Sequence, residues 1–549
     1  MSWQKSCKLL QGHKRAIKKT QGNNIACGGI FMQKLPIGIQ SFKKLRRENY
    51  LYVDKTDRLV SLISKGEKYF LSRPRRFGKS LTLSTLEAMF AGKAELFRGL
   101  AAEDWVKEQS KDPSPVLRID MSGLGNINTP ERFNEAIIDE LKNIAEDYEV
   151  EVRESYSCES FFKSLIRTLS KVKGPVVVLI DEYDKLILDS INDLEKAEEM
   201  RKVLRSFYTT IKSCDEYLRF VFITGISRFS KMGVFSAMNN LEDISLDESY
   251  GDIVGYTQLE LEDNFSEWIE FASLKMNIER EKLLDRLEDY YDGFSFDGKV
   301  KLYNPFSIMQ CLKKGEFNNY WYESGSPSFI VEYMKTHQIK APDEYRHKVV
   351  KNDFVNSAEI ERADPCSFLF QSGYLTIEKK QEQLFTLDYP NREVLDSISS
   401  MYLKLIYKVE GYALLGNQIW KALREAKLDE VISLYNTALS GIPYDDYSSS
   451  RNEFWYRSMF IMLLRGAGII AYSEPHTSKG RADIVLQFQD LFLILEFKFA
   501  KSSLEVEKKR AEGLQQLDVR EYAKNYAIEE RTVVTAVIVA DDKKRQVTL

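Results

Sequence analysis

The chain is poor in histidine and cysteine and has no long apolar run. Only four of its 549 residues are histidines, at positions 13, 337, 347 and 476, so catalysis led by histidine has little material to draw on. The six cysteines are scattered, with no CxxC pair and no neighbouring histidine. This spacing argues against zinc and against a disulfide framework, and it fits a reducing cytoplasm. Because no run of about 18 apolar residues occurs, we expect no membrane span.

The sequence also lacks the positive net charge of a protein that coats nucleic acid. Its 78 lysines and arginines face 82 acidic residues, a net charge of −4, so contact with nucleic acid must come from local patches. Residues 1–31 form one such patch, with six cations and no acidic residue: Lys5, Lys8, Lys14, Arg15, Lys18 and Lys19. Three interpretations compete for this basic leader: a nucleic-acid-binding arm, a targeting peptide, or an upstream extension of a chain that starts at Met32. We favour the third, with the leader unstructured, and leave it out of the fold prediction.

The length predicts about two to four domains. Five apolar runs within residues 32–255 are typical of strands: Lys68–Arg73, Pro115–Ser122, Pro175–Asp184, Leu218–Gly225 and the weaker Asp243–Leu246. Helical stretches alternate with them: Ser80–Phe90, Pro130–Tyr148, Cys158–Lys171 and Leu194–Cys214. This alternation predicts an α/β domain with a three-layer parallel sheet. The near-continuous VVVLI run predicts a central strand that is buried on both faces.

Two further domains are expected after residue 255. In residues 256–400 polar amphipathic helices dominate, which indicates a helical lid or connector. Residues 401–549 return to an α/β pattern: a helix at Arg451–Gly466, strands at Arg481–Phe488 and Leu491–Phe499 around a Gln489–Asp490 turn, a charged helix at Ser503–Tyr526 and a last strand at Thr532–Ala540.

A phosphate-binding motif joins the first strand to the first helix. Gly78, Lys79 and Ser80 match the end of the GxxxxGK[ST] pattern, although Arg73 stands where the first glycine belongs. Backbone N–H groups of such a loop cradle phosphates, the lysine reaches the β- and γ-phosphates, and the serine holds Mg²⁺. Arg73, Arg75, Arg76 and Phe77 complete the loop, and its arginines either line the phosphates or form a solvated rim.

An acidic pair strengthens this interpretation. Asp181 and Glu182 end the VVVLI strand, where Asp181 would bind Mg²⁺ through water and Glu182 would polarise the attacking water. Thr224 ends the next strand and would sense the γ-phosphate between the two strands. Arg228 would neutralise developing charge, either within its own subunit or across an interface of a homo-oligomer. A strand-end turn with solvated carboxylates is the competing interpretation of the acidic pair.

These segments together resemble a known family. The segments KLPIGIQSF, YVDKT, FLSRPRRFGKSLTLSTLE, IDEYD, FITGISRFS, FSAMNNLEDISL, YDGFSF and LYNPFS are similar to those of bacterial AAA-ATPase-like proteins, over about residues 32–310. In that family RPRRFGKS replaces the glycine-first loop, and a PD-(D/E)XK nuclease domain usually follows. The resemblance also implies that Asp54 and Lys55 are important, without giving them a physical role.

A second acidic constellation lies near the carboxyl end. Asp483 precedes a strand that carries Glu496 and Lys498 on one face. Two carboxylates that share a divalent cation beside a lysine form the core of the PD-(D/E)XK nucleases, and they favour water attack on a phosphodiester. Charges inside the apolar strand LFLILEFKFA are costly unless they pair or bind metal, so a Glu–Lys salt bridge is the competing interpretation.

Further residues are assigned to this site more loosely. Glu453 is predicted as an additional metal ligand, and Gln516 in GLQQL resembles the glutamine of the family's last motif. Lys501, Lys508, Lys509 and Arg510 either contact a DNA backbone or form a solvated helix face. The overall expectation is a P-loop ATPase coupled to a restriction-endonuclease-like domain, with ATP and Mg²⁺ or Mn²⁺ as cofactors and DNA rather than RNA as partner. The alternative is a nucleotide-driven switch whose last domain binds nucleic acid or a partner without cleaving it.

Overall fold

The computed structural model describes residues 25–27, 30–125, 127–190, 193–228, 240–323, 330, 333–334, 342–356, 363–406, 408–409, 411–442, 451–466, 469, 471–473, 476–477, 480–481, 483–488, 491–520 and 532–549. The chain divides into two compact units. Unit 1 comprises Met1–Tyr333 and His347–Arg392, and unit 2 comprises Met334–Arg346 and Glu393–Leu549. The domain boundaries expected after residues 255 and 400 stay predictions.

Most of the basic leader lies outside the described residues. What is described of it pairs as two short antiparallel strands, β1 (Ile25–Cys27) and β2 (Ile30–Met32). The interpretation of residues 1–24 therefore stays a prediction.

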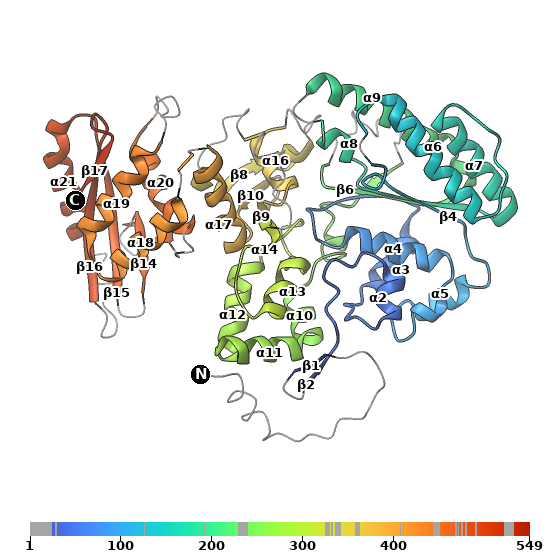
Figure 1. The fold of residues 1–549 in the computed structure, drawn as a ribbon, viewed down its shortest axis with the longest axis horizontal. Helices are drawn as coiled ribbons and strands as arrows, with labels where there is room; N and C mark the ends of the chain where they lie inside the picture. The colour runs from blue at the N-terminus through green and yellow to red at the C-terminus, as the bar shows by residue number, and fades with distance from the viewer. Residues whose placement is uncertain are drawn as a thin grey trace. The chain divides into compact units, whose positions relative to one another are not determined.

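A parallel five-stranded sheet forms the centre of unit 1 (Figure 1). Its strands are β3 (Lys68–Ser72), β4 (Val116–Asp120), β5 (Val176–Asp181), β6 (Leu218–Gly225) and β7 (Glu242–Asp243), in the order β4-β5-β6-β3-β7. Four predicted strands are confirmed as β3 to β6, and β5 is buried along its whole length. The fifth, predicted at Asp243–Leu246, shares only Asp243 with the two-residue β7. Because β6 lies between β3 and β5, the carboxyl ends of these three strands meet at one edge.

Helices cover both faces of this sheet, as Figure 1 shows. On one side lie α2 (Phe42–Arg47), α3 (Thr56–Lys65), α4 (Lys79–Phe90) and α5 (Glu103–Gln109), and on the other α6 (Pro130–Asp147) and α7 (Cys158–Lys173). The short α8 (Lys185–Leu188) and the long α9 (Leu194–Ser213) follow β5. Side chains of Thr129, Ser157 and Asp193 cap the N-termini of α6, α7 and α9, which explains why these helices begin close to their predicted positions.

The connector contains both helices and a sheet. Its helices are α10 (Gln258–Asn264), α11 (Ser266–Met276), α12 (Arg280–Tyr291), α13 (Pro305–Lys314), α14 (Tyr320–Glu323) and α16 (Pro365–Gln371). The helical prediction missed an antiparallel sheet of β8 (Lys348–Lys351), β10 (Leu384–Asp388) and β9 (Thr376–Gln381). All three strands are short, and β8 and most of β9 are exposed, so the sequence of these two lacks the apolar alternation that marks a half-buried strand. β10 is largely buried but has only five residues.

Unit 2 is built on a mixed sheet in the order β11-β14-β15-β16-β17. The strands are β11 (Ala471–Ser473), β14 (Ile484–Gln487), β15 (Leu491–Ala500), β16 (Thr532–Asp541) and β17 (Gln546–Thr548), and a separate pair is formed by β12 (His476–Thr477) and β13 (Gly480–Arg481). Its helices are α17 (Arg392–Met401, whose first residue belongs to unit 1), α18 (Tyr412–Arg424), α19 (Leu428–Ser440), α20 (Glu453–Gly466) and α21 (Val506–Arg520). The predicted helix, strand pair and last strand are confirmed, whereas α18 and α19 were not predicted.

The two faces of β15 meet different helices. The ring of Phe497 lies 5.8 Å from that of Phe460 on α20, and Ile494 shares an apolar core with Leu517 on α21. Because side chains alternate along a strand, Glu496 and Lys498 face the side of α21. The Cγ atom of Lys498 accordingly lies near Gly513 of that helix.

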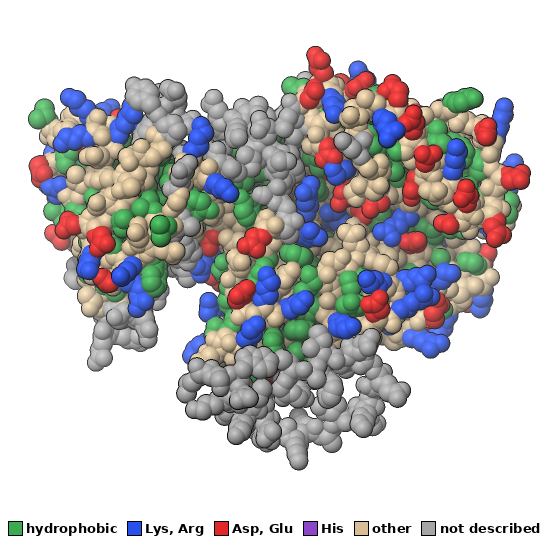
Figure 2. All heavy atoms as spheres, viewed as in Figure 1, with side chains coloured by type: hydrophobic (Ala, Val, Ile, Leu, Met, Phe, Trp, Pro, Cys, Tyr) green, Lys and Arg blue, Asp and Glu red, His purple; other side chains and the backbone are tan. Residues whose placement is uncertain are grey.

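The face of unit 1 that Figure 2 shows has no single dominant charge. Figure 2 shows lysine and arginine side chains interspersed with acidic ones over the visible face of unit 1. Within the part of the chain that the structure describes, no helix has both the length and the apolar character needed to cross a bilayer.

Candidate functional site

A tight loop joins β3 to α4 and opens with Arg73. Gly78 has φ of 95°, a left-handed conformation that a residue with a Cβ adopts only with strain, and it precedes Lys79, the first residue of α4. The Lys79 ammonium donates to the carbonyl oxygens of Arg73 and Pro74 at 2.9 and 3.0 Å. The lysine is therefore held across the loop. Burial lowers its pKa, and the carboxylates of Asp181 and Glu182 oppose that shift.

A cavity of about 460 Å³ opens beside this loop. Its lining includes the predicted loop residues Arg75, Arg76, Phe77, Gly78, Lys79 and Ser80, together with Glu182. Further lining residues come from distant segments and include the apolar and aromatic side chains of Ile39, Tyr52, Ile253, Tyr256, Phe306 and Met309. Its volume lies within the usual range of small-molecule sites, and polar and apolar side chains both line it.

Asp181 and Thr224 lie together at the ends of neighbouring strands. Asp181 is fully buried, and its Oδ1 accepts hydrogen bonds from the Glu182 backbone N–H at 3.0 Å and the Thr224 hydroxyl at 3.1 Å. Its Oδ2 has no hydrogen-bond partner among the described residues. A buried carboxylate oxygen is costly in that state, so Asp181 is well suited to a cation or an ordered water. Thr224 lies on β6, which stands between β3 and β5 in the sheet. Its role as a γ-phosphate sensor stays a prediction.

Two more carboxylates surround Lys79. Glu182 has φ of 49°, and burial raises the pKa of its carboxyl while Lys79 opposes the rise. Asp184, which sequence reasoning did not single out, accepts hydrogen bonds from the Ile226 and Ser227 backbone N–H groups at 3.0 and 2.6 Å and from the Ser227 hydroxyl at 2.5 Å. It thereby fixes the chain that follows β6 to the end of β5. Asp184 is the second aspartate of the IDEYD segment, and its place in that segment is the sequence signal that could have identified it.

The structure corrects the expected places of two arginines. The Arg73 side chain is buried away from the cavity lining, where its guanidinium donates to the carbonyl oxygens of Ser72, Ser245 and Tyr250 and lies 4.2 Å from the Phe296 ring centroid. Burial lowers its pKa to about 9.

Arg228 likewise does not line the cavity. Its guanidinium pairs with Asp243 of β7, and its backbone N–H donates to the side chain of Gln371. Both arginines therefore hold the loop and the strand ends together, rather than standing where a phosphate would bind.

Residues of the connector contact the phosphate loop through hydrogen bonds to its main chain and through aromatic rings. The carbonyl oxygen of Arg75 accepts hydrogen bonds from Asn304 Nδ2 at 3.4 Å and Trp321 Nε1 at 3.3 Å. The Arg76 guanidinium lies 5.0 Å from the Phe306 ring, and the Phe77 ring packs edge-on against Phe294 at 4.9 Å. The YDGFSF and LYNPFS segments thus support the loop directly.

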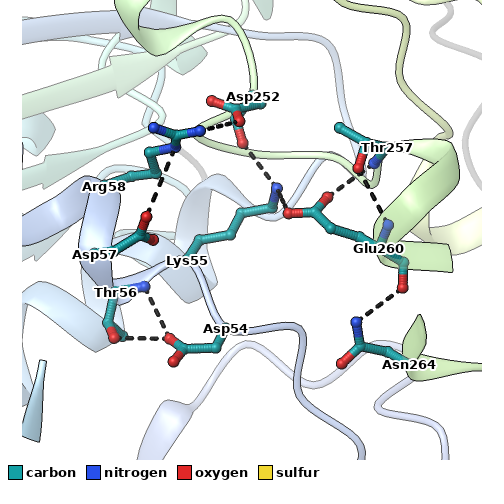
Figure 3. Close-up of polar contacts among 9 residues, drawn as sticks. All are labelled: Asp54, Lys55, Thr56, Asp57, Arg58, Asp252, Thr257, Glu260 and Asn264. Atoms are coloured by element: carbon teal, nitrogen blue, oxygen red, sulfur yellow. Dashed lines mark hydrogen bonds and ion pairs between the residues drawn. The ribbon is translucent and has the colours of Figure 1, made fainter. Parts of the chain in front are cut away.

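Asp54 and Lys55 tie three segments together at the edge of this cavity (Figure 3). Asp54 accepts hydrogen bonds from the N–H and hydroxyl of Thr56 and from the Ala101 N–H. The Lys55 ammonium reaches the opposite way, to the Asp252 carbonyl at 2.8 Å and to Glu260 Oε1 at 2.6 Å (Figure 3). Lys55 lines the cavity, so the pair connects the start of α3 to α10 beside the pocket.

Asp483, Glu496 and Lys498 gather in unit 2 around buried positions. Asp483 Oδ2 accepts a hydrogen bond from the Phe497 N–H at 2.7 Å, which joins it to β15 next to Glu496. Asp483 Oδ1 accepts a charged hydrogen bond from Arg457 Nη1 of α20 at 2.7 Å. Glu496 is buried, and its Oε1 accepts from the Lys498 ammonium at 2.9 Å. The internal salt bridge weighed from the sequence is therefore present within the predicted constellation.

Of the looser assignments, Glu453 lies near this site. The nearby charges of Lys498 and Asp483 act on the pKa of Glu453, which burial raises. Among the described residues, the group of three ligand atoms within 4.8 Å is formed by His347, Glu378 and Asp388 in unit 1, not by the three carboxylates of unit 2. Glu453, Asp483 and Glu496 are thus neighbours without forming a closed cage. Gln516 is half-buried on α21, beside Leu517.

Part of the predicted basic cluster is already neutralised. Lys509 pairs with Glu512 at 2.7 Å and Arg510 with Glu507 at 2.6 Å, both along α21. Lys501 and Lys508 are exposed. This arrangement fits a solvated helix face better than a continuous track for a DNA backbone.

Comparison with known proteins identifies two matched regions of the chain. The family described as "Predicted AAA-ATPase" matches residues 36–235, and the PD-(D/E)XK nuclease superfamily matches residues 451–548. A protein of Azotobacter chroococcum mcd 1, described as "Uncharacterized protein in vnfD 5'region", is 36% identical over 509 residues, which cover 90% of this chain and 94% of that protein.

Among solved structures, the ORC1 protein of Aeropyrum pernix in complex with DNA aligns over 63% of this chain and 92% of its own, at 10% identity and a TM-score of 0.23. A TM-score this low establishes nothing further about this chain. The relation to the Azotobacter protein spans both units, and the two matched regions contain the phosphate loop and the acidic strand. The chain belongs to the family of AAA-ATPase-like proteins that carry a C-terminal domain of the PD-(D/E)XK nuclease superfamily.

Proposed function

We propose that this protein binds and hydrolyses ATP in unit 1 and uses a divalent cation in unit 2 to cleave nucleic acid, DNA in preference to RNA, with foreign or mobile DNA as its target. The observation that carries the ATPase part is the cavity that unites Lys79, Ser80 and Glu182. Beside it, Asp181 Oδ2 is buried and without a described partner. Such an oxygen fits a site that expects Mg²⁺.

The roles in unit 1 follow from these positions. Lys79 would exchange its two loop carbonyls for the β- and γ-phosphates, and the backbone N–H groups that open α4 would cradle them. Ser80 and Asp181 would hold Mg²⁺, and Glu182 would orient and polarise the attacking water. Thr224, bonded to Asp181, would sense the γ-phosphate. The apolar and aromatic side chains that line the cavity suit a flat purine base.

In unit 2 the donor set fits a hard divalent cation, because Asp483, Glu496 and Glu453 offer carboxylate oxygens. A bound Mg²⁺ or Mn²⁺ supplies Lewis acidity and a more acidic water there. Lys498, bonded to Glu496, would neutralise charge that builds up on the phosphate. Gln516 is proposed to assist from α21.

A second candidate keeps the ATPase and replaces cleavage with binding. It is favoured by the Arg457–Asp483 ion pair, which takes up the carboxylate that a metal needs. In this version nucleotide turnover drives a switch, and unit 2 binds nucleic acid or a protein partner.

Cleavage and ATP turnover measured on the same preparations separate these candidates. Single- and double-stranded DNA and RNA are incubated with Mg²⁺ or Mn²⁺, with and without ATP. We expect Glu182→Gln to lower ATP turnover by about 10²-fold or more, because a general base contributes that much. Lys498→Ala should lower cleavage by about 10²-fold or more, because preorganised charge at a reacting phosphate contributes that much.

The matched control for Lys498 is Lys501→Ala, an exposed lysine three residues further on, which should leave cleavage unchanged. Cleavage that persists in Lys498→Ala and Asp483→Ala would refute the nuclease proposal. ATP turnover without cleavage of any substrate would select the second candidate.

A further inference from the structure

Both oxygens of Asp483 are already engaged. Oδ2 accepts the Phe497 N–H, which is a backbone contact that fixes the carboxylate against β15. Oδ1 accepts a hydrogen bond from the Arg457 guanidinium at 2.7 Å, which is a side-chain contact. Any cation that coordinates Asp483 through Oδ1 therefore has to compete with Arg457.

This ion pair is enclosed rather than solvated. The side chains of Arg457 and Asp483 are 9% and 12% exposed, and the guanidinium lies 5.3 Å from the Phe454 ring centroid. Water screens a pair of this kind weakly, so its mutual attraction is stronger than that of a surface salt bridge. A metal ion would then displace a firmly held cation, not a loosely associated one.

Arg457 occupies the same helix face as a predicted metal ligand. Glu453 and Arg457 are four residues apart on α20, so their side chains project from the same face. The pKa of Glu453 responds to Asp483, Lys498 and Arg457, which places all four groups in one neighbourhood. One face of α20 thus presents both a further carboxylate and a competing cation to Asp483.

We propose that Arg457 sets the affinity of unit 2 for its divalent cation, because its guanidinium holds Asp483 Oδ1 until the cation displaces it. The inference rests on the proposed metal site at Asp483 and Glu496. It accounts for the absence of a closed three-carboxylate cage among the described residues of unit 2. It also makes the cation concentration, and not the carboxylates alone, decide when the site is loaded.

Binding of Mn²⁺ to the full-length protein tests this inference without relying on cleavage. The protein is titrated in the absence of nucleotide, and free Mn²⁺ is followed by electron paramagnetic resonance. We expect Arg457→Met to bind one Mn²⁺ about tenfold more tightly than the wild type or better, because the competing charge is gone. Arg457→Lys, which keeps a cation, should bind much closer to the wild type. Asp483→Asn, added to Arg457→Met, should abolish the gained site.

Arg457→Gln serves as a second neutral variant in case Arg457→Met does not fold, and ATP turnover by unit 1 checks the integrity of each preparation. Mn²⁺ affinity in the neutral variants that equals the wild type would refute the competition. A lower affinity would also refute it, because Arg457 would then assemble the site. A third outcome is that neither the wild type nor any variant has a Mn²⁺ site that depends on Asp483. That result would refute the metal site in unit 2, and the proposed nuclease with it.

Discussion

Asp292 ends α12 with a carboxyl group that is buried in the YDGFSF turn. Burial raises its pKa to about 6, while the neighbouring Gly293 N–H opposes the rise. The pKa in the unfolded chain is about 3.9, so the native state binds the proton more tightly. The stability contributed by this proton is complete below about pH 4 and is lost as the pH rises through 6. At neutral pH the charged Asp292 therefore destabilises the fold.

We predict that Asp292→Asn stabilises unit 1 at pH 7.5 by up to about 3 kcal/mol, since each pKa unit corresponds to about 1.4 kcal/mol. The amide keeps the acceptor for Gly293 and carries no charge. The advantage should shrink towards pH 4, where the aspartate is also neutral. Calorimetric melting at both pH values measures it. Asp289→Asn, an exposed position on the same helix, is the control, and an equal gain there would contradict the burial argument.

The sequence predicts the positions of some residues of the phosphate site and not of others. Lys79, Ser80 and Glu182 meet because short motifs at the ends of strands fix where their side chains start. Arg73 and Arg228 were misplaced because a long guanidinium side chain finds its partners at a distance. Those partners, the carbonyls of Ser245 and Tyr250 and the carboxylate of Asp243, lie on segments that no local motif connects to the loop.

At the scale of elements, the tie between α3 and α10 borders the cavity. Lys55 joins the chain before α3 to Glu260 of α10, and Glu260 also accepts the Thr257 N–H through its other oxygen in a capping box. Lys55 lines the cavity, so loss of the Lys55–Glu260 ion pair should weaken nucleotide binding more than it slows the hydrolysis step.

We predict that Lys55→Met and Glu260→Gln each raise the KM for ATP by about threefold to tenfold, with kcat changed by less than about twofold. Glu260→Gln keeps the capping interaction and removes only the charge. Arg58→Met, which removes the more exposed ion pair with Asp252, is the control and should have little effect. A loss confined to kcat, or an equal effect of Arg58→Met, would show that the tie does not position the nucleotide.

Elements followed from the sequence where burial imposed a pattern. The central strands of unit 1 were predictable because both faces are covered and the apolar run is continuous. The β8-β10-β9 sheet was not, because its strands expose charged side chains such as those of Lys379 and Lys380. Gly373 and Gly293, which closely approach Pro74 and Pro390, join parts of unit 1 through contacts that sequence spacing does not encode.

At the scale of the whole molecule, the chain joins an AAA-ATPase-like domain to a domain of the PD-(D/E)XK nuclease superfamily, and functional coupling between the two would have a measurable signature. If ATP changes the affinity of the protein for nucleic acid, nucleic acid must change the affinity for ATP by the same factor. We predict a reciprocal change of about fivefold or more. The measurement uses the double variant Glu182→Gln with Lys498→Ala, in which neither ligand is consumed. Fluorescence anisotropy with labelled DNA and a labelled nucleotide gives both factors.

Two equal factors near one would mean that the units bind their ligands independently, which would contradict this prediction. Unequal factors would show that one of the binding reactions is not at equilibrium. Lys79→Ala, which removes the phosphate lysine, is the control and should erase the effect of ATP.

Both units are discontinuous in sequence, which matters for synthesis of the chain and for the preparation of fragments. Met334–Arg346 belongs to unit 2 but is followed by His347–Arg392 of unit 1. During synthesis, Met334–Arg346 of unit 2 therefore emerges from the ribosome before unit 1 is complete. This segment cannot pack in unit 2 until Glu393–Leu549 has been made. A cut after Arg392 would strand Asp343 on the wrong fragment and deprive the buried Arg465 of its ion-pair partner. Neither unit can therefore be excised as one uninterrupted stretch of the chain.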